Sequence, residues 1–204
     1  LGTQVETLAT VVNGMNTLQM LPYDYVMIIG FGPIGYLFAQ FAKNIAAKVA
    51  VTEIDPFRIN VAKECGLTVW NPHEVDVVQK ITDFTYGRKA DIVIEATGNA
   101  LAQALQCVTP GGKVLPFGMD SSVNIDVKPN DITRWATKVL GLYLGQNTMV
   151  PSIRIFQENR LNMGPFFTQV IPLEDGVEAF CDLGLDPATL AHGPKKAMKI
   201  VMKP

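Results

Sequence analysis

Three glycines early in the chain have a spacing that suits the binding of phosphate groups. They belong to the segment Gly30-Phe31-Gly32-Pro33-Ile34-Gly35. When such a Gly-x-Gly-x-x-Gly segment follows a strand and opens a helix, it cradles the pyrophosphate of a dinucleotide. The first glycine makes the tight turn, the second lets the pyrophosphate approach the backbone, and the third lets the helix pack closely on the sheet. The phosphates then lie against the free N–H groups of the helix N-terminus. The alternative is a glycine-rich turn that binds no ligand.

An acidic residue lies where a fold of this kind binds a ribose. Glu53 follows Gly30 by about 20 residues, which is the spacing of the acid that accepts hydrogen bonds from the ribose hydroxyls. A carboxylate there repels a 2′-phosphate and so favours NAD over NADP. Asp55 is the competing candidate, although the proline after it is typical of a helix start. Ile54 and Arg58 complete this group. Arg58 could reach the ribose edge, or it could be a solvated charge on the following helix.

Two further turns are expected close to the glycine segment. Thr97-Gly98 and Phe117-Gly118 each follow an apolar, β-rich run. Ligands of parallel sheets bind in the crevice outside the carboxyl ends of the strands. We therefore expect these four residues to line the cofactor cleft. Glu95, at the end of the first of these runs, is expected to be structural rather than catalytic.

The elements that would position these residues alternate along the chain. Short β-rich runs alternate with helical stretches, which is typical of βαβ units and a parallel sheet. The expected helices are 33–44, 56–65, 74–83 and 101–107. The expected strands are 25–29, 48–52, 68–70, 91–94, 113–117 and 138–144. The pattern predicts an α/β fold, a Rossmann doubly wound parallel sheet with helices on both faces.

The remaining segments are less regular. Residues 120–130 are expected to form a loop, and the segments after it a helix (150–159), an extended run (166–171), a helix (173–183) and a closing strand (196–202). Residues 1–21 have the apolar pattern of a helix. We predict three parts: a helix at 1–21 that links to a further domain upstream, a dinucleotide-binding domain at 22–165, and a C-terminal segment at 166–204 that returns towards that further domain.

Composition excludes several classes of function. The formal net charge is −2 without a cluster of basic residues, so nucleic acid is not an expected partner. Hydrophobic residues make up 48% of the chain, as suits strands that are buried on both faces. No apolar run is long enough to span a bilayer. No basic segment precedes an apolar stretch, so we expect no secretory signal.

The cysteines and histidines do not form a recognisable site. The three cysteines are widely separated and form no Cys-x-x-Cys pair: they are Cys65, Cys107 and Cys181. We therefore expect them to be reduced and to pack in the interior of a cytoplasmic protein. His73 and His192 have no acid or cysteine at a ligand-like spacing. We expect both to be surface loop residues, with no metal site and no nucleophilic triad.

The ordered segments VMIIGFGPIG, VTEIDPFRINVAKECG, ADIVIEATG and VTPGGKVLPFGM together resemble the medium-chain dehydrogenase/reductase superfamily. Within it, they are most similar to the zinc-dependent alcohol, polyol and threonine dehydrogenases. VIPLEDGVEAF and KKAMKIVMKP resemble the C-terminal return helix and strand of these enzymes. Lys199 resembles a basic residue near that strand and is a candidate phosphate contact. The alternative is a solvated strand lysine.

The resemblance implies an NAD-dependent oxidoreductase that acts on an alcohol or carbonyl substrate. Its members carry the zinc ligands in an N-terminal GroES-like domain whose motifs are absent here, so no metal ligand is expected in this chain and the chain alone should be inactive. Val5-Glu6-Thr7-Leu8 resembles the Glu-Pro-Leu segment near the metal, with Thr7 in place of proline. Members generally dimerise through the cofactor domain, and we expect a homodimer through the edge from Lys138 to Leu144. The alternative is that residues 166–171 or a loop cover this edge within one chain. The alternatives are a zinc-free quinone or enoyl reductase that uses NADPH and a stand-alone NAD-binding module.

Overall fold

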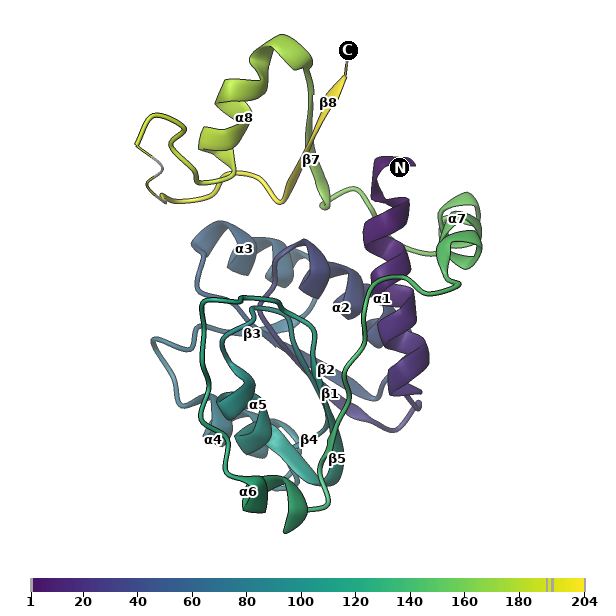
Figure 1. Cartoon of the computed structure of the whole chain (residues 1–204), viewed down its shortest axis with the longest axis vertical. Helices are drawn as coiled ribbons and strands as arrows, with labels where there is room; N and C mark the ends of the chain where they lie inside the picture. Colours follow the sequence, from purple (N-terminus) through teal and green to yellow (C-terminus); the bar gives the residue numbers. More distant parts are fainter. Residues whose placement is uncertain (1, 190, 192, 204) are drawn as a thin grey trace.

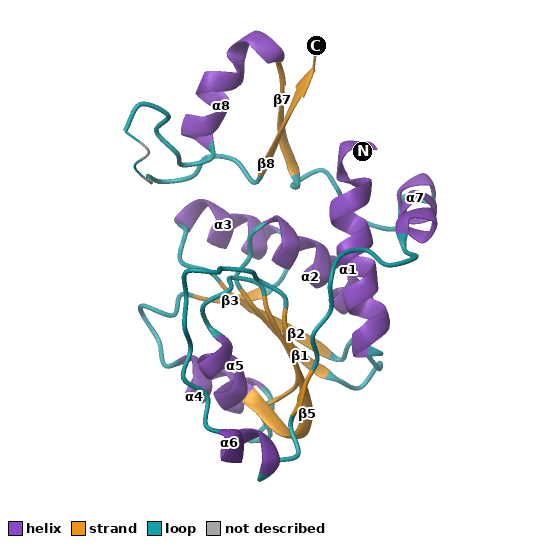
Figure 2. Cartoon of the chain, in the orientation of Figure 1, coloured by secondary structure: helices purple, strands orange, loops and turns teal. Residues whose placement is uncertain are grey.

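A parallel six-stranded sheet lies at the centre of the chain (Figure 2). The computed structural model describes residues 2–189, 191 and 193–203. All strand pairs are parallel, in the order β3-β2-β1-β4-β5-β6. The strands are β1 (Tyr25–Ile29), β2 (Lys48–Thr52), β3 (Thr68–Trp70), β4 (Ala90–Glu95), β5 (Val108–Pro116) and β6 (Lys138–Val139). This order is that of a doubly wound sheet, so the predicted fold class is confirmed.

Helices cover both faces of the sheet because alternate residues of each strand point to opposite sides. Val26 and Ile28 of β1 belong to one core cluster, whereas Met27 and Ile29 belong to another. The first cluster is closed by α1 (Val5–Leu18), α2 (Pro33–Ile45), α3 (Pro56–Glu64) and α7 (Met149–Gln157). The second is closed by α4 (Val77–Phe84) and α5 (Leu101–Cys107). The sheet is therefore buried on both faces, as its continuous apolar strands require.

The C-terminal segment forms a small unit on the side of α2 and α3, away from the sheet (Figure 1). Strands β7 (Phe167–Pro172) and β8 (Lys199–Lys203) pair in parallel, and they are connected through a 3-10 turn (Leu173–Asp175) and α8 (Gly176–Asp182). Phe166 and Met198, which precede the two strands, are buried in the same core cluster as α2. The unit is thus anchored to the main domain by the residues that lead into its strands.

The expected edge strand is the main error in the predicted elements. The sequence predicts a strand from Lys138 to Leu144, but β6 ends at Val139. Leu140 still donates its N–H to the carbonyl of Val114 at 2.9 Å. The chain then leaves the sheet to reach α1, where the Asn13 amide donates to the carbonyl of Leu144 at 2.7 Å. Leu140 and Leu142 pack against the core cluster that includes α1, whereas Tyr143 and Leu144 are exposed, so the apolar run does not mark a longer strand.

Other boundaries differ by a few residues. Strand β5 begins at Val108, ahead of the expected 113, because Val108 already pairs with Ala90 of β4, before a register shift that precedes the pair of Lys113 with Ile92. The predicted loop at 120–130 runs into a short helix, α6 (Pro129–Thr133). Strand β8 begins at Lys199, not at 196. The predicted helix at 1–21 is a 3-10 turn (Gly2–Gln4) followed by α1, which ends at Leu18.

The cysteines and histidines are only partly as predicted. Cys107 is buried, and burial raises the pKa of its thiol to about 12. Cys65 is half-buried, but Cys181 is exposed, so the prediction of an interior position is wrong for Cys181. His73 is exposed in a turn, as expected, and His192 lies outside the described residues. Within the described ranges, no three His, Cys, Asp or Glu side chains are grouped as metal ligands. None of the described helices combines the length and apolarity that crossing a membrane requires.

We expect Gly35→Ala to destabilise the fold, because α2 lies too close to β1 for a side chain. A Cβ atom at Gly35 would lie 2.0 Å from the carbonyl oxygen of Gly30. The free energy of unfolding should fall by about 2–3 kcal/mol, as measured by urea denaturation. Gly141→Ala is the matched control, because a Cβ there would meet nothing within 4 Å. Equal stability of the two variants would contradict this reading of the contact.

Candidate cofactor-binding site

Three turns meet at the carboxyl ends of β1, β4 and β5. Gly30 has a φ of +90°, and a Cβ atom on it would lie 2.7 Å from Cγ2 of Thr97. A Cβ atom on Gly118 would lie 2.1 Å from the main-chain nitrogen of Gly98. The glycine segment, Thr97-Gly98 and Phe117-Gly118 are therefore in direct contact, and that they line a cofactor cleft stays a prediction. β1 stands between β2 and β4, where the strand order reverses and where ligands of such sheets bind.

The glycine segment leads directly into the N-terminus of α2. Gly32 is the N-cap residue and Pro33 stands in the first turn, where its missing N–H leaves no bond unmade. A Cβ atom on Gly32 would meet no main chain, and its nearest neighbour would be Nη1 of Arg58 at 3.3 Å. Phe31 is fully buried and Ile34 is half-buried, both against the core. The space over Gly32 is thus bounded by one flexible side chain, which suits the approach of a phosphate group.

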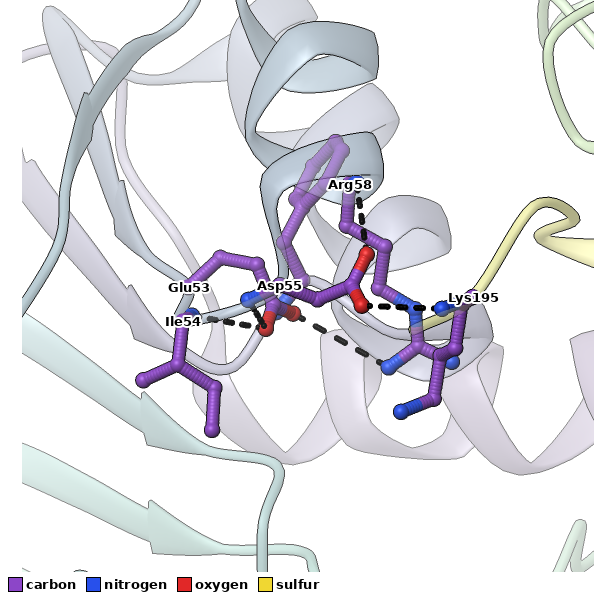
Figure 3. A network of polar contacts seen from close by, with 6 residues as sticks. Glu53, Ile54, Asp55, Arg58 and Lys195 are labelled. Atoms are coloured by element: carbon purple, nitrogen blue, oxygen red, sulfur yellow. Dashed lines mark hydrogen bonds and ion pairs between the residues drawn. The ribbon is translucent and has the colours of Figure 1, made fainter. Parts of the chain in front are cut away.

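Glu53 ties the turn after β2 to the glycine segment (Figure 3). Its side chain is only 7% exposed. Oε1 accepts the N–H groups of Ile54 at 2.8 Å and Asp55 at 3.0 Å. Oε2 accepts the N–H of Phe31 at 3.0 Å and lies 3.9 Å from Nη1 of Arg58. The carboxylate that the sequence assigns to the ribose therefore also holds two turns together.

The carboxylate of Asp55, the competing acid, accepts hydrogen bonds from main-chain N–H groups. Its Oδ1 accepts the N–H of Arg58 at 3.1 Å and so caps α3. Its Oδ2 accepts the N–H of Lys195 at 3.3 Å, a contact that the sequence did not predict because it joins residues 140 positions apart. Asp55 thus has the helix-starting role that its following proline indicates.

Arg58 is not the solvated charge that was considered as an alternative. Its side chain is only 17% exposed, and its Nε is buried without a hydrogen-bond partner among the described residues. Such a donor is costly to leave unpaired, so it suits a group that accepts a hydrogen bond. Ile54 beside it is 55% exposed and offers an apolar surface at the same edge.

Glu95 organises the other two turns from the inside. It is buried, and its Oε1 accepts the N–H groups of Thr97 at 2.8 Å and Gly98 at 2.9 Å. The hydroxyl of Thr97 also donates to this oxygen. The main-chain carbonyl of Glu95 accepts from Phe117 at 2.8 Å and from Gly118 at 2.9 Å. This is the structural role that the sequence predicts for it.

Lys199 lies apart from these contacts. It is the first residue of β8, and its N–H donates to Oγ1 of Thr168 at 3.4 Å. Within the described part of the chain, its ammonium forms no ion pair. A phosphate contact by Lys199 stays a prediction.

A cavity of about 790 Å³ lies at the other end of the sheet and includes none of the predicted residues. It is lined by residues near the amino-terminal ends of β4, β5 and β6, among them Arg88, Pro110 and Trp135. The turns at the carboxyl ends, with the N-terminus of α2 and the unpaired Nε of Arg58, are the region where the sequence predicts the dinucleotide.

A family model described as zinc-binding dehydrogenase matches residues 33–158. The chain belongs to this family. It is 38% identical to the L-threonine 3-dehydrogenase of Pyrococcus furiosus over an alignment of 150 residues. This alignment covers 70% of this chain and 43% of that protein. It is 29% identical to the (R,R)-butanediol dehydrogenase of Neisseria gonorrhoeae over 89% of this chain and 50% of that protein. The solved structure of 2R,3R-butanediol dehydrogenase from Bacillus subtilis covers the whole chain with a TM-score of 0.86 at 25% identity.

This zinc-binding dehydrogenase chain spans about half the length of the curated relatives it matches. The matched half is the cofactor-binding domain, which agrees with the glycine segment and with the sheet order. The family resemblance inferred from the sequence is thereby confirmed.

We expect Glu53→Ala to destabilise the domain in the absence of any cofactor. The substitution would leave three main-chain N–H groups without their acceptor and Arg58 without its counter-charge, at a cost of about 2–4 kcal/mol. Urea denaturation measures the change. Glu64→Ala, at the exposed end of α3, is the control and should change stability by less than about 0.5 kcal/mol. A Glu53→Ala chain as stable as this control would show that the network contributes nothing.

Proposed function

We propose that the chain is the NAD(H)-binding domain of a zinc-dependent alcohol or polyol dehydrogenase. In the whole protein, hydride would pass between an alcohol or carbonyl substrate and the nicotinamide. The observation that carries the cofactor assignment is the position of the Glu53 carboxylate, buried at the end of β2 and bonded to the N–H of Phe31. A carboxylate at this position accepts ribose hydroxyls and repels a 2′-phosphate.

The Glu53 carboxylate retains capacity for a ribose hydroxyl. An ionised carboxylate offers about four acceptor positions. Oε1 accepts two N–H groups, whereas Oε2 accepts one and faces Arg58 at 3.9 Å. A ribose hydroxyl would bind at Oε2 while the Arg58 guanidinium turns towards the ribose or the pyrophosphate. This geometry also argues against the NADPH-dependent, zinc-free alternative.

The other residues of the site would bind and orient the cofactor. The α2 N-terminus over Gly32 would hold the pyrophosphate, and the turns at Thr97-Gly98 and Phe117-Gly118 would direct the rest of the molecule along the carboxyl ends of β4 and β5. The nicotinamide supplies the hydride chemistry when it is bound. We place the zinc, which would polarise the substrate oxygen, in the half of the relatives that this chain does not span. The chain alone should therefore bind cofactor without turning over substrate.

Calorimetric titration with NAD(H) and NADP(H) tests this proposal. NAD(H) should bind more tightly, because Glu53 accepts the ribose diol and repels a 2′-phosphate. Gly32→Val should abolish binding without unfolding the chain, because its branched side chain would fill the space between Gly32 and Arg58. Gly141→Ala, remote from any neighbour, should bind as the unaltered chain does. Equal or tighter binding of NADP(H), or retained affinity in Gly32→Val, would refute the assignment.

We further propose that two copies pair through β6. The strand is the last of the sheet, and an uncovered edge invites pairing with another chain. Exposed apolar side chains follow along the same segment, at Val139, Tyr143 and Leu144. A two-fold axis at this edge would join the two sheets in the isologous manner of most homodimers.

Light scattering on the purified chain should report a dimer at tens of micromolar. Because the N–H of Leu140 points to β5, the alternation of a strand directs that of Val139 outwards. Val139→Pro removes this outward donor and leaves the pairing with β5 in place, so it should yield a monomer. If the Val139→Pro chain is still a dimer, the contact between the copies lies elsewhere. If the unaltered chain is a monomer, the proposed dimer is excluded.

A further inference from the structure

The C-terminal segment reaches the cofactor-binding site at Lys195. Asp55 accepts the Lys195 N–H with Oδ2 at 3.3 Å and the Arg58 N–H with Oδ1 at 3.1 Å. Asp55 is buried, with 9% of the residue exposed. One buried carboxylate therefore fixes the main chain of two basic residues that are more than 130 positions apart in the sequence.

The residues that follow hold this segment in place. Ala197 and Met198 are buried, and Met198 belongs to the core cluster beneath α2 and α3. The N–H of Met198 donates to Oγ1 of Thr168 at 2.7 Å. Lys195 thus stands two residues before a buried anchor, so its position beside α3 is determined by packing and by the hydrogen bond to Asp55.

The Lys195 ammonium is free to meet a ligand. Within the described part of the chain it makes no ion pair, whereas its neighbour Lys196 pairs with Asp182 at 3.8 Å. In Figure 3 the Lys195 and Arg58 side chains both extend from main chain that is hydrogen-bonded to the Asp55 carboxylate. Arg58 in turn lies 3.9 Å from Glu53 and borders the space over Gly32. Two cations therefore stand at the edge of the site where the ribose of the adenosine would meet Glu53.

We propose that Lys195 is a specificity-determining residue whose ammonium, with the Arg58 guanidinium, binds a phosphate on the adenosine ribose. The chain would then accept NADP(H) as a second, weaker cofactor despite Glu53. The proposal rests on the proposed function, because it assumes that a nicotinamide dinucleotide binds over the glycine segment. Its physical basis is that hydrogen bonds between two ionised groups are stronger than neutral ones and offset part of the carboxylate repulsion.

Calorimetric titration of the chain with NADH and NADPH tests the role of Lys195. Lys195→Ala should weaken NADPH binding about tenfold, which is about 1.4 kcal/mol, and should leave NADH binding within about twofold. Lys195→Gln should behave in the same way if the charge is responsible. Lys196→Ala is the matched control, because this adjacent lysine already pairs with Asp182, and it should change neither affinity. Thermal denaturation checks that each variant is folded.

The other outcomes separate the two proposals. Equal weakening of NADH and NADPH in Lys195→Ala would mean that the ammonium contacts the pyrophosphate common to both, and would overturn the specificity role. Unchanged affinities would overturn it too, as would an unaltered chain that binds NADH but not NADPH. In all three cases the proposed function stands, because NADH still binds. Failure of the unaltered chain to bind NADH would refute the proposed function itself.

Discussion

The close approach of α2 to the end of β1 is the constraint on which the rest of the site depends. Gly35 lies against the carbonyl of Gly30, so the helix must begin directly at the end of the central strand. Its first N–H groups then face the turn where the strand order reverses, between β2 and β4. A bulkier residue at Gly35 would move the helix outwards and take these donors away from the turns at Thr97 and Gly118.

Buried carboxylates stabilise the turns around the start of α2 through hydrogen bonds to main-chain N–H groups. Glu53 and Glu95 stand at corresponding ends of β2 and β4, and Asp55 stands two residues beyond Glu53. Each accepts at least two main-chain N–H groups. A buried charge is costly unless it is hydrogen-bonded, and charge-assisted bonds to main-chain donors offset this cost. The turns around the site are therefore ordered before any ligand arrives, which lowers the entropy that binding must overcome.

Much of the fold could be predicted because its signals are local. The glycine segment, the proline at each helix start and the short apolar runs lie within a few residues of the structures they specify, and strands β1 to β4 agree with the expected positions within one residue. The errors arise where distant segments decide. The run after Lys138 leaves the sheet to meet α1, and the burial of Arg58 and the approach of Lys195 depend on Glu53 and Asp55. No pattern along the chain marks such pairings, since they join residues that only the folded structure brings together.

The packing of α1 has a consequence for how the polypeptide can acquire its structure during synthesis. Thr148 donates its hydroxyl to the carbonyl of Ala9, and Asn13 donates to that of Leu144, so these two hydrogen-bond partners of α1 are separated from it by more than 130 residues. Loop closure over such distances slows folding. Until those residues leave the ribosome, the helix carries apolar side chains such as Leu8 and Val11 that have not reached their full burial. The packing of α1 is therefore completed late, only after the segment around Thr148 has been synthesised.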